Sequence, residues 1–307
     1  MNKQTLTVGI AAYNEEKNID HLLKSILRQR QEIFSLEQII VACDGCTDNT
    51  VSIVQKFVKK YNFIKLLNES ERIGKSLALN KIYTLASSDF LLTFDADVLL
   101  DRNIEIELMV KVINNHPQVD LVGGRFIPIE QKNIMGNFSL ISYLSFEDAF
   151  LRLNNGNNIF ALVGLASLMR KKLYKKFLYP KGTISDQNYL YVMATKNNPH
   201  GFTLARRTRI YLRTVSTFND WRILGARSVI ADKENIAYFF GDEILEKYSM
   251  PKNIYFISLI KWFLKSPFYS AGSLVMNIFI RLFPYKKNIV KNGMWKLAVS
   301  SKEAIEI

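Results

Sequence analysis

Residues 5–27 read TLTVGIAAYNEEKNIDHLLKSIL, an apolar run followed by a polar turn and a segment of helical periodicity. The run 5–11 has the length and apolar content of a buried strand. After the turn, apolar side chains recur every three or four residues, at Ile19, Leu22, Leu23, Ile26 and Leu27. That spacing predicts a helix with one apolar face, so the stretch is a strand followed by a helix.

The same unit repeats along the first hundred residues. Strand-like runs follow at 38–43 (QIIVAC), 63–67 (FIKLL) and 89–94 (DFLLTF), with helical segments near 51–58 and 74–86 between them. Strands that alternate with helices in this way predict the α/β class, with a mostly parallel, doubly wound sheet. Such sheets bind ligands beyond the carboxyl ends of their strands.

Composition limits the class of protein further. The chain has 307 residues, 48% of them hydrophobic, which is enough for one large core and a second small region and excludes a disordered chain. The opening MNKQTLTVGI lacks the charged-then-apolar pattern of a secretory signal, so we expect a cytoplasmic location. Cys43 and Cys46 form a CxxC with no second pair, and we interpret them as structural.

Acidic residues stand where the predicted strands end. Asp44 closes the run QIIVAC, while Asp95 and Asp97 follow DFLLTF. If the chain turns at Ala96, the last two carboxylates point to a common ligand, and hard oxygen ligands suit Mg²⁺ or Mn²⁺. The alternative interpretation is a turn with two solvated acids.

Four motifs occur in a characteristic order: AAYNEE, CDGCTDNT, ERIGKSLALN and FDADV. Their order and spacing resemble the nucleotide-sugar domain of family 2 glycosyltransferases, inverting enzymes of the GT-A fold. The resemblance covers about residues 5–230. It implies a Rossmann-like GT-A sheet, a glycosyltransferase activity, a nucleotide-sugar donor and a divalent metal, Mn²⁺ or Mg²⁺, as cofactor.

The resemblance also implies individual roles. It places these residues around the nucleotide: Ala12, Tyr13, Glu15, Asp44, Arg72, Lys75 and Asp95. Asp44 would contact the base, and Arg72 and Lys75 would lie near the phosphates. Asp95 and Asp97 would hold the metal on the diphosphate.

Asp186, in TISDQNYLYVMATKNN, matches the family's catalytic base. An inverting transfer needs one carboxylate to accept the proton of the acceptor hydroxyl as that hydroxyl attacks the anomeric carbon. The motif reads SDQ here instead of TED, so the neighbouring acid is missing. Taken alone, Asp186 could equally be the N-cap of the helix that follows it.

Three further residues are candidates for the acceptor or diphosphate side: Gly164, Trp221 and Arg227. Gly164 lies in NNIFALVGLASLMRKKL, which resembles the segment lining the acceptor pocket or is an ordinary core strand. Arg227 is what remains of a QxxRW-like signature, which reads LGARS at 224–228. This departure favours transfer of a single sugar over processive synthesis.

The tail changes character, and we divide the chain into a catalytic domain, 1–230, and a helical, amphipathic C-terminal region, 231–307. Lysines and arginines flank its apolar runs, and Pro267 divides it before either half reaches the length of a membrane span. Together with Trp262 this favours helices lying in an anionic membrane interface. The alternative is a pair of helices packed on the catalytic domain or on a second copy, which would make a homo-oligomer.

Together these features predict a peripheral enzyme on the cytosolic face of a membrane. It would move one sugar, from a UDP-sugar, to a lipid-linked or saccharide acceptor. The alternative is a nucleotide-binding scaffold without catalysis. The net charge of +13 favours anionic partners, but we find no nucleic-acid-binding motif and expect no nucleic acid partner.

Overall fold

The computed structural model describes residues 3–283, 290–291 and 294–305. Its first part alternates strands and helices in the predicted order: β1 (Gln4–Ala12), α1 (Ile19–Leu27), β2 (Phe34–Asp44), α2 (Thr50–Lys60), β3 (Ile64–Glu69), α3 (Lys75–Leu85) and β4 (Phe90–Asp95). The predicted strands and helices of this half are therefore confirmed.

The second part adds further elements, among which the sequence predicted the helix after Asp186 and the helices of the C-terminal region. They are β5 (Val98–Leu100), α4 (Glu105–Asn115), β6 (Leu121–Pro128), α5 (Ile134–Arg152), β7 (Ala166–Arg170), α6 (Lys171–Tyr174), α7 (Asp186–Thr195), β8 (Phe202–Leu212), α8 (Phe218–Ala226), α9 (Asp232–Phe240), α10 (Lys252–Lys265), α11 (Pro267–Leu282), β9 (Val290–Lys291) and β10 (Met294–Trp295). Short 3₁₀ turns span Leu153–Gly156, Ile159–Ala161, Asp242–Tyr248 and Val299–Lys302, and a π-helical turn, Arg227–Ala231, joins α8 to α9.

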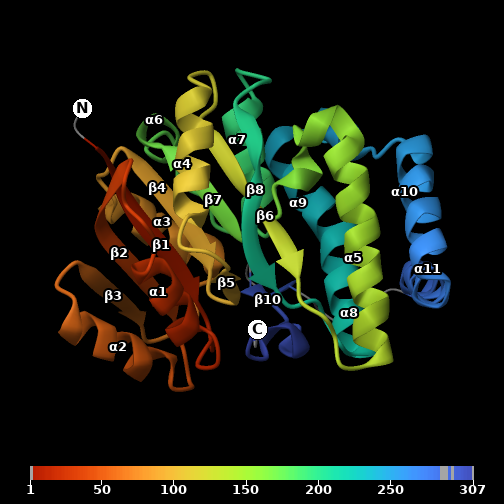
Figure 1. The fold of residues 1–307 in the computed structure, drawn as a ribbon, viewed down its shortest axis with the longest axis horizontal. Coiled ribbons are helices and arrows are strands. Elements are labelled where there is room, and N and C mark those ends of the chain that lie inside the picture. The colour runs from red at the N-terminus through yellow and green to blue at the C-terminus, as the bar shows by residue number, and fades with distance from the viewer. Residues whose placement is uncertain (1–2, 284–289, 292–293, 306–307) are drawn as a thin grey trace.

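One large sheet organises the molecule, in the order β3-β2-β1-β4-β7-β6-β8-β5 (Figure 1). Strands β3, β2, β1 and β4 run parallel to one another, and β6 runs parallel to β8. Strand β7 is antiparallel to both its neighbours, and β5 is antiparallel to β8. The mostly parallel α/β sheet of the prediction is confirmed.

Helices cover both faces of the sheet because the central strands are apolar on both sides. Ile39 and Val41 of β2 pack into the cluster that holds α1 and α4. Their neighbours Ile40 and Ala42 face the opposite cluster, with α3 and α7. These two apolar clusters fill both faces of the sheet. Polar side chains gather instead at the carboxyl ends of the parallel strands.

The C-terminal region is helical, as predicted, and α10 and α11 pack on α5 at one side of the molecule (Figure 1). Ser258 donates a hydrogen bond of 2.8 Å to Asp148, and Asn277 donates one of 2.9 Å to Ser142. The division at residue 230 stays a prediction. Among the residues described, no helix is both long and apolar enough to cross a bilayer.

Candidate active site

The parallel strands bring the predicted site residues to one edge of the sheet. In the register of β1 with its neighbours, Ala11 lies beside Asp95 and Ala12 beside Cys43, the residue before Asp44. The chain then turns at Ala96 and Asp97, as predicted. The loops after β1, β2 and β4 therefore meet at this edge.

A lysine joins two of the acids. The Lys75 ammonium lies 2.7 Å from a carboxylate oxygen of Asp95 and 3.1 Å from one of Asp186. Lys75 is the first residue of α3, and Gly74 before it has a φ of 99°, a conformation that glycine adopts readily. The fold thus brings together acids that stand 91 residues apart in the sequence.

Asp186 is the first residue of α7, where Ser185 occupies the N-cap position and makes no side-chain capping bond. The alternative interpretation of Asp186 as an N-cap is therefore wrong. Its carboxylate is nearly buried and pairs with Lys75 instead. An acid held this way is oriented by a partner outside its own helix.

The site carries more negative charge than its lysines balance. Burial and the neighbouring carboxylates of Asp97 and Asp186 raise the pKa of Asp95 to about 6, although Lys75 opposes this. Burial lowers the pKa of Lys75, but the two acids outweigh burial and raise it above its ordinary value. An added cation would relieve this repulsion.

Glu15 contributes a further acid to the site. Its carboxylate is buried, and burial together with Asp97 raises its pKa to about 8, although Lys302 opposes this. The Lys302 ammonium contacts the Glu15 carboxylate and donates a hydrogen bond of 2.7 Å to the carbonyl of Tyr13. Lys302 comes from the far end of the chain, and the sequence carried no signal for its place here.

The predicted nucleotide loops hold one another. The Asp44 carboxylate accepts hydrogen bonds from the backbone N–H groups of Ile73 and Gly74, at 2.6 and 3.0 Å. Asp44 therefore fixes the loop that carries Arg72, whose guanidinium lies 4.2 Å from the centre of the Tyr13 ring. Gly45 allows this close approach, because a Cβ there would lie 2.4 Å from the backbone nitrogen of Arg72.

The donor set fits a divalent cation shared with a ligand. Among the described residues, no three acidic, histidine or cysteine side chains are arranged to hold a metal ion alone. Asp95 and Asp97 stand on either side of the turn at Ala96, and the charge of Asp97 adds to burial in raising the pKa of Asp95. Two carboxylates that leave coordination positions for phosphate oxygens and water are the usual arrangement for Mg²⁺ in phosphate-binding sites.

The remaining predicted residues lie around α7 and α8. Gly164 has a φ of 85°, and a Cβ there would lie 2.7 Å from the Cβ of Gln187, so this loop approaches the start of α7 closely. Trp221 is buried in a small apolar cluster with Ile280 of α11. Arg227 begins the π-helical turn and lies near Asp232.

Two residues near Asp186 were not predicted. Burial raises the pKa of Asp232 to about 6; Arg227 opposes this, and the charge of Asp186 adds to it. The Asn235 amide accepts a hydrogen bond of 2.8 Å from the backbone of Ile184 and donates one of 3.0 Å to the carbonyl of Gly182. These bonds fasten the loop before Asp186 to α9. Spacing alone gave no signal for either residue.

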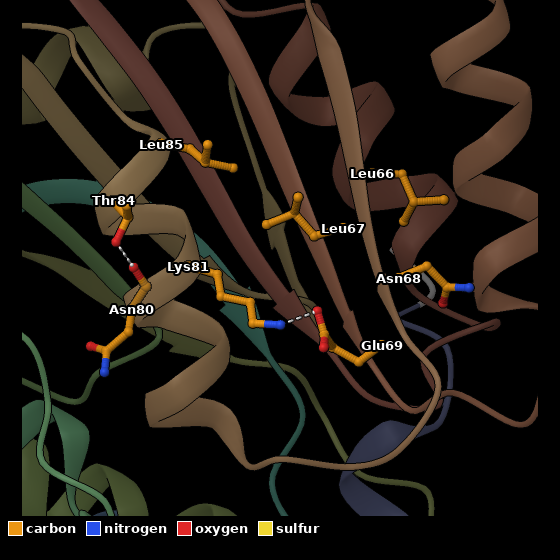
Figure 2. A pocket seen from close by; sticks show the side chains of 8 residues that line it. All are labelled: Leu66, Leu67, Asn68, Glu69, Asn80, Lys81, Thr84 and Leu85. Carbon is orange, nitrogen blue, oxygen red and sulfur yellow. Dashed lines mark hydrogen bonds and ion pairs between the residues drawn. The ribbon is translucent and has the colours of Figure 1, made fainter.

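A separate pocket lies between β3 and α3. Figure 2 shows its lining, in which Lys81 points across to Glu69 and forms an ion pair of 2.5 Å. Apart from this pair the lining residues are neutral: Leu66, Leu67, Asn68, Asn80, Thr84 and Leu85. None of the carboxylates described above lines it, so it is distinct from the candidate active site.

The mostly parallel sheet, with acidic side chains at its carboxyl edge, is the arrangement expected of a GT-A glycosyltransferase. Residues 7–178 match the family described as glycosyl transferase family 2. The chain belongs to this family and is a glycosyltransferase. The resemblance inferred from the motifs is confirmed.

Relatives with assigned functions include polysaccharide synthases. The poly-beta-1,6-N-acetyl-D-glucosamine synthase of Staphylococcus aureus (strain COL) is 29% identical over 140 residues, which is 46% of this chain and 33% of the relative. The synthase of the same name from Staphylococcus epidermidis is 27% identical over 171 residues, 55% of this chain and 40% of the relative. The matches span a third to two fifths of the relatives' length.

Solved structures share the fold. A mannosyltransferase of Pyrobaculum calidifontis in complex with GDP-Man and Mn²⁺ has a TM-score of 0.59 and 17% identity, over 92% of this chain and 77% of that one. Glucosyl-3-phosphoglycerate synthase of Mycobacterium tuberculosis in complex with Mg²⁺ and UDP has a TM-score of 0.53 and 16% identity, over 81% of this chain and 80% of that one. At these identities the likeness establishes the GT-A fold.

Proposed function

We propose that this glycosyltransferase moves one sugar, with inversion, from a UDP-sugar to a lipid-linked or saccharide acceptor. The observation that carries the proposal is the Lys75 bridge, 2.7 Å from Asp95 and 3.1 Å from Asp186. It places the acid proposed to serve the donor next to the acid proposed to activate the acceptor. Direct transfer requires the sugar of the donor and the hydroxyl of the acceptor to lie side by side, so the acids that serve them must be close together as well.

On the donor side, Asp95 and Asp97 would hold the divalent metal. A bound metal would neutralise charge on the diphosphate as it departs. Arg72 and Lys75 would lie near the phosphates, because Arg72 lies in the loop that Asp44 fixes and Lys75 follows that loop directly. Tyr13 and Glu15, after β1, would contact the base and ribose.

On the acceptor side, Asp186 would accept the proton of the attacking hydroxyl. The ion pair with Lys75 holds the Asp186 carboxylate in a fixed direction, which a general base requires. The loop before it is fastened to α9 by Asn235, which supports the position of Asp186 at the start of α7. One displacement suffices, and no covalent sugar intermediate on the enzyme is needed.

The region 231–307 would deliver the enzyme to an anionic membrane on the cytosolic face. We call the exposed side of α10 and α11 the apolar face; its most exposed large side chains are Phe256, Leu264, Phe268, Val275 and Leu282, each more than 60% exposed. Lys252, Lys265 and Arg281 lie exposed on the same two helices. Apolar side chains flanked by lysine and arginine are typical of helices that lie in an anionic interface. Lys286 and Lys287, which the tail pattern also included, lie outside the described residues.

A vesicle assay tests this surface. Leu264→Glu with Val275→Glu adds two negative charges to the apolar face, so sedimentation with vesicles containing phosphatidylserine should fall strongly. Tyr238→Glu, at a residue 82% exposed on α9, is the matched control and should bind as the native chain does. Equal binding of all three proteins would show that the apolar face does not contact the membrane. Self-association lost only in the double variant would assign the face to packing between copies.

Calorimetric titration of UDP and GDP, with Mn²⁺ and with chelator, tests the donor site. We expect metal-dependent binding of UDP that Asp97→Ala abolishes. Binding of GDP alone would correct the nucleobase. If the folded protein bound neither nucleotide, the donor proposal would fail; binding without sugar transfer to any acceptor would favour the non-catalytic scaffold.

A further inference from the structure

The segment Ala298–Ile305, which we call the strap, crosses the edge of the sheet where the acids gather. At one end Arg213 donates hydrogen bonds to the carbonyls of Glu303 and Ala304, at 3.2 and 2.5 Å. Ser300 is bonded twice to the loop and helix that follow β8, accepting from Ser216 at 3.0 Å and donating to Asp220 at 2.8 Å. The strap is therefore anchored on the side of β8 and α8.

Its other contacts are with the turn after β1. Asn18 donates a hydrogen bond of 2.9 Å to the carbonyl of Lys302, and the Lys302 ammonium bonds the carbonyl of Tyr13 and the carboxylate of Glu15. An ion pair of 2.7 Å joins Lys17 to Glu303 at the surface. The strap thus connects the loop after β8 to the turn 13–18, two parts of the site that share no strand pairing.

The turn 13–18 benefits from this support. Asn14 has a φ of 53°, in the left-handed region that residues with a Cβ seldom adopt. Glu15 is 5% exposed, and its second carboxylate oxygen accepts a hydrogen bond from Asn18 at 3.2 Å. A buried carboxylate next to Asp97 costs free energy unless a cation pairs with it. Lys302, whose side chain is 18% exposed, supplies that cation.

We propose that the strap is a component of the nucleotide-diphosphate site and that Lys302 is a positioning residue, holding Tyr13 and Glu15 in the orientation that binds the donor. The inference rests on the proposed function, because it assigns the turn 13–18 to the nucleotide. It adds a residue outside the matched region 7–178. A long cation fits the role because it reaches a backbone carbonyl and a carboxylate at once.

Two readouts test the proposal on the full-length chain. Lys302→Met removes the ammonium and keeps the stem, so hydrogen exchange of the amides in 13–18 should speed up and the affinity for UDP with Mn²⁺ should fall about tenfold. Lys302→Arg should restore most of both. Lys24→Met removes an exposed ion pair with Asp20 on α1, outside the turn and the strap, and should change affinity by less than about twofold.

The outcomes separate the two proposals. If the native chain binds UDP and Lys302→Met binds it equally well or more tightly, the role of Lys302 is overturned and the proposed function stands. Tighter binding would mean that the strap competes with the nucleotide. If the native chain bound no nucleotide, both proposals would fall, even where exchange in 13–18 responded to the substitution. Should Lys302→Met not fold, Arg213→Gln frees the other end of the strap, and the same loss of affinity is expected.

Discussion

Replacing Lys75 by methionine is the sharpest test of the charge arrangement at the edge of the sheet. The change keeps most of the side chain's volume and removes the cation that lies between Asp95 and Asp186. Losing one partner of a fully buried pair costs about 3–5 kcal/mol, while an exposed pair is worth about 0–1 kcal/mol. The three side chains are 31%, 23% and 12% exposed, so we expect about 2 kcal/mol of the free energy of unfolding to be lost.

Equilibrium unfolding in urea, followed by circular dichroism, measures this loss. Lys81→Met is a matched control, because Lys81 lies on the same helix and forms an ion pair of 2.5 Å with Glu69, with 44% of its own side chain exposed. We expect the control to lose less than about 1 kcal/mol. If the two variants were equally stable, Lys75 would be no more than another surface cation, and our account of the site would be refuted.

Other expected outcomes concern the base, the loop against α7 and the docking of α10. Asp186→Asn should lower sugar transfer at least about a hundredfold while UDP affinity changes little; unchanged turnover would remove the residue from catalysis. Gly164→Ala should cost about 1–3 kcal/mol in urea unfolding, because φ is 85° and the new Cβ meets a neighbouring side chain at 2.7 Å. Gly182→Ala, with a φ of 88° but nothing within 4 Å, should cost less, and equal losses would argue against the steric term. Burial raises the pKa of Asp148, but the hydrogen bonds it accepts, one of them from Lys261, outweigh burial and lower the pKa to about 2. The ionised Asp148 carboxylate therefore stabilises the fold above pH ~4, and this stabilisation is lost as the pH falls toward 2. Asp148→Asn should therefore flatten the pH dependence of the melting temperature between pH 4 and 2, and an unaltered profile would contradict this.

Local patterns predicted the first half of the sheet well. The apolar runs that became β1, β2 and β4 are buried on both faces, so each reads as a continuous hydrophobic segment, and the helices between them have one apolar face. The acids at the strand ends were predictable for the same reason. A parallel sheet brings those ends to one edge whatever the side chains are.

The second half depends on contacts that no local pattern encodes. Strand β7 enters the sheet antiparallel between β4 and β6, and β5 has only three residues, too few for a periodicity. Lys302 and Asp232 reach the site through tertiary packing, and an isolated lysine or aspartate in a helical segment reads as a solvated side chain. Asp186 was found only through the family motif. From its own surroundings in the sequence it looked like a helix cap.

The strap also has a consequence for how the protein is made. Glu15 and Lys302 are separated by 287 residues, so the contact between them closes almost the whole chain into a loop. During synthesis the strands β1, β2, β3 and β4 can pair once about a hundred residues are available, because they pair with one another within that stretch. The contact between Glu15 and Lys302 can form only after residue 302 has left the ribosome. A nascent chain that stalls earlier would therefore carry the first strands of the sheet without this contact.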